Sequence, residues 1–341
     1  MSCITSVLYK LPHSKHFTRI TSQSNPIVLK SLLQVPLSGG YIIMPFTISS
    51  ESPLLFIQPD KVEVCPLVLP STKRTQHAQM HTNEAEERAN YTQAFNKVKH
   101  KLNGHLLQKV VLSRRLNIEQ LQGNDAEQLF LRACHYRPNS FVALWNTPQT
   151  GQWLVATPEP LLEMHHHQCS TVALAGTLPW VEGEAPHWNH KNKEEQAIVA
   201  RYIKQQLANV ATNIHTSATY TLHTGNIQHL CTDFTFNLYN ASDLPAVLQQ
   251  LHPTPAVCGL PCDEAKAAIK EAEHSPRLYY AGFSGPIHLY NETHLFVSLR
   301  CMHFTSHSAT LYAGGGIMPE SLENEEWEET QRKMETIKSI L

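Results

Sequence analysis

The chain has 341 residues, with 27 lysines and arginines against 29 aspartates and glutamates, and a formal net charge of −2 at pH 7. A near-neutral chain without a basic run between aromatic residues is not expected to bind nucleic acid, and no apolar run approaches the roughly 20 residues that span a membrane. The eight cysteines form no C-x-x-C pair, which is typical of reduced thiols in the cytoplasm rather than of a disulfide framework.

The first 80 residues are predicted to be a strand-rich part of the fold. Residues 1–50 contain no Asp or Glu, a composition that resembles a transit peptide. However, the apolar runs GYIIMPFTISS and LLFIQPDKVEV are bounded by turn residues and predict strands. The folded chain therefore begins before residue 50, and a cytoplasmic location is favoured. Residues 62–80 are polar and predict turns.

The run TNEAEERANYTQAFNKVKHKLNG, residues 82–104, predicts a long helix, because Tyr91, Phe95, Val98 and Leu102 recur at helical spacing and Gly104 is a stop. The strand QKVVLSRRLNI comes directly after it. ATPEPLLEM and CSTVALAGTL then predict a pair of strands joined by an exposed turn. Three consecutive histidines fall in this turn, where we expect no metal site.

Residues 189–210 predict a second long helix. The last third alternates short strands, YYAGFSGPIHLY, HLFVSLRCMHF and ATLYAGGG, with a helix around residues 262–273 and a closing helix. Strands that recur through hairpins, with helices between them, favour an antiparallel α+β fold over a doubly wound one.

The closing helix is amphipathic. At about 100° per residue, an apolar stripe faces the core, and Ser321 is a candidate N-cap. Glu326, Glu329 and Lys333 lie along the edge of this stripe. Two carboxylates and an ammonium there suggest a site for a charged ligand or a metal. The alternative is that these charged side chains extend into water or form ion pairs on the surface, which explains the same pattern.

Glu195 falls inside the buried stripe of the second long helix. A carboxylate on a core-facing surface is costly unless it is paired or coordinates a cation. With Glu329 it would offer oxygen ligands to a hard ion such as magnesium. A buried pair with Lys or Arg accounts equally well for Glu195.

Lys109 and Glu159 are candidates for acid–base chemistry. Lys109 begins a strand with apolar neighbours, and a lysine held in such surroundings can act as a general base. Glu159 stands between two prolines, whose fixed φ directs the carboxylate. A lysine that reaches water and a glutamate in a surface turn are the alternatives for these positions.

Taken together, nine ordered motifs resemble those of the chorismate-utilising enzymes. The resemblance covers roughly Glu84 to Leu341, and the motifs are KVVLSR, ATPEPLLE, ALAGT, KEEQAIV, QHLCT, LHPTPAVCGLP, YYAGFSGP, VSLRCM and AGGGIMPESLENEEWEETQRK. The resemblance implies a single large α+β domain, with two antiparallel sheets packed as a sandwich and helices outside. It also implies chorismate as the substrate, Mg²⁺ as the cofactor, and a chorismate-binding catalytic region over residues 81–341.

The resemblance assigns roles residue by residue. Lys109 corresponds to the water-activating base and Glu159 to the general acid. The metal carboxylates correspond to Glu195 and Glu329, with Glu326 acting through water. The groups that hold the substrate correspond to Gly176, Thr177, His229, Ala256, Tyr280, Arg300, Gly314, Gly316 and Lys333. The family's Glu-His pair is Glu195-Gln196 here, and Pro160 replaces a leucine beside the acid, so these two positions depart from the pattern.

Within the family, the resemblance is greatest to the isochorismate synthases. Ammonia-using relatives carry glutamine at Lys109, and some carry a nucleophilic lysine at Ala175, so water is the expected nucleophile and no glutaminase subunit is expected. Salicylate synthases usually carry threonine at Ala256 and remain the alternative enzyme class, and a non-catalytic metal-binding scaffold is the alternative outside catalysis. We expect a monomer or weak dimer, whose product enters menaquinone or siderophore synthesis.

Overall fold

The computed structural model describes residues 5–68, 81–119, 125–224 and 227–341. Their strands form two sheets of ten, and every strand pair is antiparallel. Antiparallel strands suit this chain because many short connections link consecutive elements. The prediction of a single α+β domain with two antiparallel sheets is confirmed.

The first sheet, in spatial order, contains β16 (Gly259–Leu260), β8 (Lys109–Glu119), β20 (Ser308–Ile317), β19 (Cys301–Phe304), β10 (Gly151–Thr157), β9 (Phe141–Thr147), β1 (Thr5–Lys10), β2 (His16–Ser22) and β6 (Lys61–Pro66), with β7 (His81–Thr82) paired to β8. The second contains β13 (Thr212–Thr216), β15 (Ile227–Asn237), β12 (Gln168–Pro179), β11 (Pro160–His165), β18 (Glu292–Val297), β17 (Phe283–Ile287), β4 (Gly40–Met44), β5 (Leu54–Ile57) and β3 (Ile27–Leu29), with β14 (Tyr220–Thr224) paired to β15.

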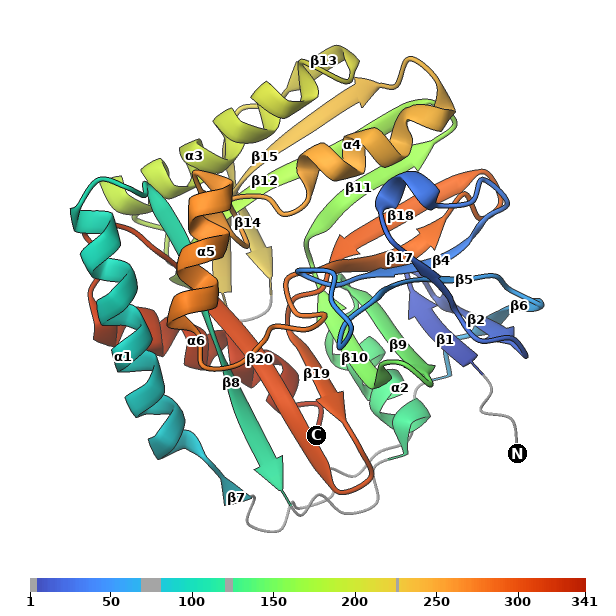
Figure 1. The fold of residues 1–341 in the computed structure, drawn as a ribbon, viewed down its shortest axis with the longest axis horizontal. Coiled ribbons are helices and arrows are strands. Elements are labelled where there is room, and N and C mark those ends of the chain that lie inside the picture. Colours follow the sequence, from blue (N-terminus) through green and yellow to red (C-terminus); the bar gives the residue numbers. More distant parts are fainter. Residues whose placement is uncertain (1–4, 69–80, 120–124, 225–226) are drawn as a thin grey trace.

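The helices are α1 (Glu84–Asn103), α2 (Ala126–Tyr136), α3 (His190–Leu207), α4 (Leu244–Leu251), α5 (Cys262–Ala272) and α6 (Glu323–Lys338), with short 3₁₀ turns at Leu32–Gln34 and Ala241–Asp243. Figure 1 shows α1, α3 and α5 at one end of the molecule and β1, β2 and β6 at the other. Among the described residues, no helix is long and apolar enough to cross a membrane.

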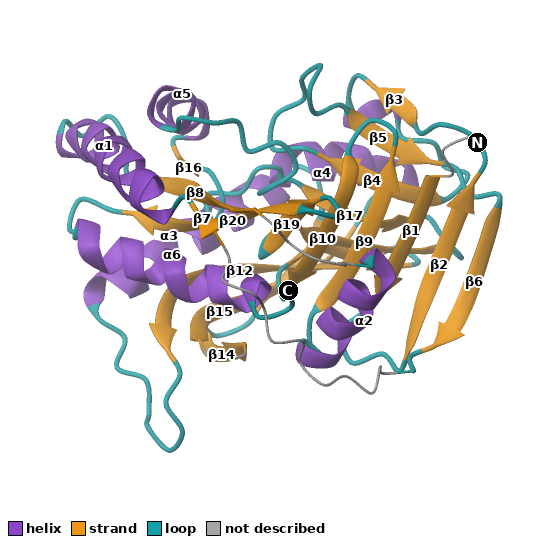
Figure 2. Cartoon of the chain, turned by 90° about the horizontal axis from the view of Figure 1, so that it is seen from below, coloured by secondary structure: helices purple, strands orange, loops and turns teal. Residues whose placement is uncertain are grey.

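Two apolar cores hold these layers together. The larger contains side chains of both sheets and of α1, α3, α4 and α5. The smaller contains Phe130 of α2 and Met334 and Ile337 of α6, packed against side chains of the first sheet. Figure 2 shows α2 and α6 lying along that sheet. The apolar stripe predicted for the closing helix therefore faces a core.

The N-terminal strands are built into both sheets. β1 pairs with β9 in the first sheet, and β4 pairs with β17 in the second. Residues 62–80 were expected to be turns, but Lys61–Pro66 form β6, which pairs with β2. Residues 69–80 lie outside the described part of the chain.

Two further expectations were wrong in detail. The run HLFVSLRCMHF was expected to be one strand, but it forms β18 in the second sheet and β19 in the first. Arg300 lies between them with φ of 45°, a left-handed conformation that redirects the chain. Ser321 is not the N-cap of α6; Leu322 takes that position, and Ser321 Oγ accepts a hydrogen bond from the backbone N–H of Met318 instead.

Candidate active site

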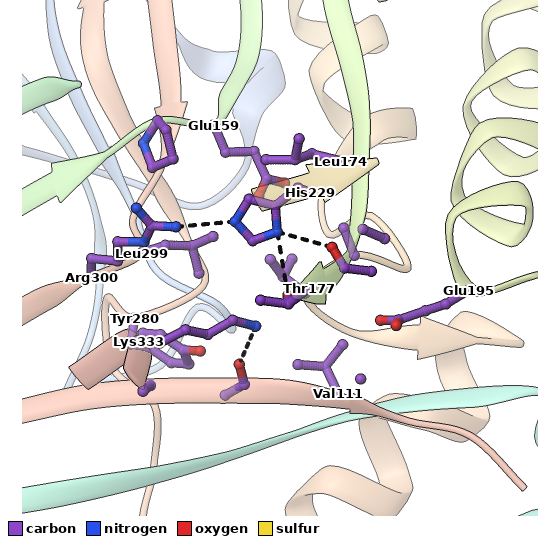
Figure 3. Close-up of a pocket in the computed structure, with 18 of the residues that line it drawn as sticks. Val111, Glu159, Leu174, Thr177, Glu195, His229, Tyr280, Leu299, Arg300 and Lys333 are labelled. Atoms are coloured by element: carbon purple, nitrogen blue, oxygen red, sulfur yellow. Dashed lines mark hydrogen bonds between the residues drawn. The ribbon is translucent and has the colours of Figure 1, made fainter. Parts of the chain in front are cut away.

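A pocket lies where the chain crosses between the sheets and β19 begins. β19 pairs with β20 only as far as Tyr312, so the glycines that follow in β20 have no partner strand on that side. Side chains from both sheets, α3 and α6 close around this edge (Figure 3). The lining residues are Val111, Pro158, Glu159, Leu174, Ala175, Gly176, Thr177, Glu195, His229, Ala256, Val257, Tyr280, Leu299, Arg300, Tyr312, Ala313, Gly314, Gly316 and Lys333.

Arg300 and His229 form one wall of the pocket. Nη2 of Arg300 lies 3.2 Å from Nε2 of His229, and Nδ1 of His229 lies 3.0 Å from the carbonyl oxygen of Gly176. A guanidinium only donates and a carbonyl only accepts, so His229 carries its proton on Nδ1 and is neutral. Burial, reinforced by the charges of Arg300 and Lys333, holds the pKa of His229 well below its ordinary value.

Gly176 shapes the backbone beside this histidine. The register of β12 shifts between Ala175 and Thr177, and Gly176 has φ of +73°. A Cβ atom there would lie 3.1 Å from the carbonyl oxygen of Asn192 in α3. The bulge thus needs glycine for its conformation and for close packing of α3, and it directs the Gly176 carbonyl at His229.

Glu159 lies on the opposite side of the pocket in Figure 3 from the glycine strand and is 6% exposed. Burial raises the pKa of Glu159 to about 7, against the opposing effect of nearby cations, chiefly Lys333. A substantial part of the carboxyl group is therefore protonated at neutral pH. Burial also lowers the pKa of Arg300 to about 10, which leaves the guanidinium charged.

Lys109 is fully buried at the start of β8, with its Nζ 3.0 Å from Oε1 of Glu195. The distance defines an ion pair, although the angle is not that of a hydrogen bond. Both side chains cross over Gly316, where a Cβ atom would overlap the Glu195 carboxylate and lie 2.8 Å from Cε of Lys109. Glycine at this position is what lets the pair approach the strand.

Glu326 and Glu329 of α6 meet the backbone at Gly315. A Cβ atom there would lie 3.2 Å from Oε2 of Glu326 and 3.4 Å from Oε1 of Glu329. Burial, together with the charge of Glu329, raises the pKa of Glu326 to about 7. Burial would also raise the pKa of Glu329, but Lys333, whose Nζ lies 2.7 Å away, lowers it.

Lys191 of α3 forms an ion pair with Glu326. Burial opposes its charge, but three carboxylates, Glu326 first and then Glu195 and Glu329, raise the pKa of Lys191 overall. Lys333 completes the cationic set by donating to the carbonyl oxygen of Gly314 at 3.0 Å. Three carboxylates and three ammonium groups thus lie around the glycine strand.

Glu195, Glu326 and Glu329 are the candidate metal ligands. Among the described residues, no three His, Cys, Asp or Glu side chains are gathered closely enough to coordinate one ion. Even so, two of the carboxylates are buried beside each other and repel, and all three offer the hard oxygen donors that magnesium prefers. This donor set fits Mg²⁺, provided that the lysine partners give way.

The two departures from the family pattern have structural explanations. Gln196 is buried and donates from Nε2 to Thr232 Oγ1 at 2.8 Å, which ties α3 to β15. Pro160 begins β11 without turning Glu159 away, since Glu159 still lines the pocket and its carbonyl oxygen accepts from the N–H of Val297 at 3.0 Å.

The pocket brings together most of the predicted site residues. Of those named from the sequence, Lys109, Glu326 and Glu329 lie just behind its lining, and the others form it. Lys191 and Tyr312 were missed. Lys191 precedes Glu195 by four residues and so lies on the same face of α3, and Tyr312 directly precedes the glycine run; both signals are present in the sequence.

Comparison with known proteins decides the family. Residues 60–341 match the family described as chorismate binding enzyme. The chain belongs to this family. A vibriobactin-specific isochorismate synthase of Vibrio cholerae is 30% identical over 243 residues, which cover 68% of this chain and 61% of that protein. The matched region thus spans about three fifths of that relative's length.

Two solved structures share the fold. DhbC from Bacillus anthracis superposes with a TM-score of 0.85 at 21% identity, over 98% of this chain and 96% of that one. MenF, the menaquinone-specific isochorismate synthase from Escherichia coli, superposes with a TM-score of 0.82 at 21% identity, over 100% of this chain and 89% of the other. At this identity the likeness concerns the fold.

Proposed function

We propose that this chorismate binding enzyme is an isochorismate synthase, which isomerises chorismate to isochorismate. The observation that carries the proposal is the raised pKa of Glu159, about 7, in the pocket that Lys109 adjoins. A carboxylic acid that keeps its proton and a lysine deep in the site are the two groups that exchange of a hydroxyl for water requires.

The cations of the pocket suit the substrate. Chorismate carries two carboxylates, and Arg300 and Lys333 would neutralise and orient them. His229 accepts from Arg300 on Nε2 and so fixes the plane of the guanidinium. Because His229 is neutral, it directs Arg300 without adding or removing charge. Tyr280 and Ala256 line the same pocket and limit where the ring can lie.

The reaction moves one hydroxyl. Water attacks C2 of chorismate and gives a proton to neutral Lys109, while the C4 hydroxyl leaves with the proton of Glu159 and the ring double bonds shift. One proton is taken and one is given, so the product is an isomer of the substrate. The next turnover needs the proton returned from Lys109 to Glu159.

Lys109 faces a carboxylate, and this contact matters for its role. Nζ of Lys109 lies 3.0 Å from Oε1 of Glu195, so the proposed role as a base requires that Glu195 is shared with another cation. Glu195 and Glu329 would hold Mg²⁺, with Glu326 reaching it through water. When bound, the ion would supply positive charge to a substrate carboxylate.

The nucleophile and product follow from three positions. By resemblance, ammonia-using relatives carry glutamine at the position of Lys109. Some of them also carry a nucleophilic lysine at the position of Ala175. Ala256 favours release of isochorismate over pyruvate elimination. A vibriobactin-specific and a menaquinone-specific isochorismate synthase both resemble this chain, and either route would use isochorismate.

The test is a product analysis of the purified protein with chorismate and Mg²⁺, without ammonia. We expect isochorismate in reversible equilibrium with chorismate, identified by chromatography and NMR. Salicylate and pyruvate as the main products at neutral pH would place the protein with the salicylate synthases. No conversion of chorismate at all would contradict the proposal.

A further inference from the structure

Each of the three carboxylates around the glycine strand has its own lysine. Glu195 pairs with Lys109 at 3.0 Å, Glu329 with Lys333 at 2.7 Å, and Glu326 with Lys191. The proposed function accounts for Lys109 and Lys333. It gives no task to Lys191.

Lys191 lies at the entrance of this cluster. It is in the first turn of α3, four residues before Glu195, and its side chain is 19% exposed, whereas that of Glu326 is 2% exposed. The pair joins α3 to α6, the two helices that carry the carboxylates. The ammonium therefore has access to water, and the carboxylate that it neutralises does not.

We propose that Lys191 is an internal counter-ion, which neutralises Glu326 in the metal-free chain and yields its place to Mg²⁺. This role rests on the metal site of the proposed function. Lys191 would thereby set the affinity of the site for Mg²⁺ without taking part in the chemistry.

The physical argument is one of charge balance. Buried carboxylates are stable only with a cation beside them, and in the metal-free chain Lys191 provides it for Glu326. An ion with two positive charges at the same carboxylates would repel an ammonium held a few ångströms away. The lysine side chain is long and flexible, with a strongly hydrated head, so it can leave Glu326 for solvent at little cost.

Lys191→Met tests this role. Isothermal titration with MgCl₂, without substrate, would give the Kd of the ion, and thermal unfolding would give the melting temperature with and without it. In Lys191→Met we expect a lower melting temperature without Mg²⁺ and a Kd tighter by about tenfold or more, since one close unit charge is removed. Lys191→Arg keeps the charge and should restore weaker binding. Lys193→Met, an exposed position in the same turn, is the matched control and should behave as the wild type.

The outcomes separate this role from the proposed function. Binding by the wild type with an unchanged or weaker Kd in Lys191→Met overturns the counter-ion role and leaves the metal site standing. Absence of Mg²⁺ binding in both proteins overturns the metal site and the counter-ion role together. Binding in Lys191→Met alone supports the role, because the lysine then excludes the ion completely.

Discussion

Nε2 of His229 accepts a hydrogen bond from Arg300, which fixes the imidazole as a neutral Nδ1–H tautomer. Because burial and nearby cations hold the pKa of His229 well below its ordinary value, we predict that this ring stays neutral between about pH 5 and 8, where an unperturbed histidine titrates. Nitrogen-15 NMR of histidine-labelled protein measures this directly. The resonance is assigned by its loss in His229→Gln, and a titrating signal would contradict the tautomer.

Glu159 is predicted to set the alkaline limb of the activity profile. Its pKa of about 7 belongs to the enzyme without substrate, so kcat/KM should fall as the pH rises through this value and the protonated acid is lost. Glu159→Gln should lower kcat by about 10² to 10⁴-fold, the usual contribution of a general acid, with a smaller change in KM because Arg300 and Lys333 remain. A variant that retains more than about a tenth of the activity would show that another group is the acid.

The same shift predicts a gain in stability for that variant. A carboxyl group whose pKa is raised on folding favours the folded state below its unfolded pKa and loses this contribution as the pH rises through the folded value. Glu159→Gln carries a neutral amide that does not titrate, so the stability of this variant does not fall in the same pH range. Urea unfolding should therefore show the variant at least as stable as the wild type at about pH 8. An equal fall in the free energy of unfolding of both proteins with rising pH would argue against a raised pKa of Glu159.

Lys109→Met is predicted to lower kcat by about 10² to 10⁴-fold, as expected for loss of a general base. It should also destabilise the metal-free chain, because Glu195 loses the ammonium 3.0 Å away. Mg²⁺ should restore part of the melting temperature, since the ion can replace that charge. Lys15→Met, on an exposed turn, controls for the loss of one positive charge. Normal turnover in Lys109→Met would remove the base assignment.

The carboxylates are predicted to differ in their effect on metal. Glu195→Gln and Glu329→Gln should abolish the rise in melting temperature on adding Mg²⁺, because amides are poor partners for a hard dication. Glu326→Gln should reduce this rise in melting temperature by less, because Glu326 is proposed to reach the ion through water. Circular dichroism checks that each variant folds. A wild-type rise in melting temperature with Mg²⁺ in Glu195→Gln or Glu329→Gln would contradict the assignment of that residue as a metal ligand.

Much of this site could be predicted from the sequence. Helical spacing places Glu195 on the buried face of α3, and the motifs order Lys109, Glu159 and Arg300 along the chain. Periodicity did not show how deep Glu326 lies. On α6 alone it is a border residue, yet it is 1% exposed, because α3 packs beside it and Lys191 covers it. The spacing of apolar residues along one helix does not indicate which other helix packs against it.

Strand periodicity also could not show the break at Arg300. The run is apolar on either side, as in one continuous strand, yet β18 and β19 pair with different strands and Arg300 between them is left-handed. By contrast, α2 was missed although Leu129, Phe130, Ala133 and Cys134 lie at helical spacing after a capping aspartate. That signal was present in the sequence.

The crossing between β18 and β19 limits how this chain can change its length. Residues 298–300 join two strands whose registers are fixed independently, by β11 and β17 on one side and by β10 and β20 on the other. Surface loops accept insertions at small cost, but this joint is no surface loop, since Ser298 is 1% and Arg300 8% exposed. An insertion here would leave both sheets paired and still carry Arg300 out of reach of His229. A deletion or insertion at this joint would therefore disrupt the pocket even where both sheets keep their pairing.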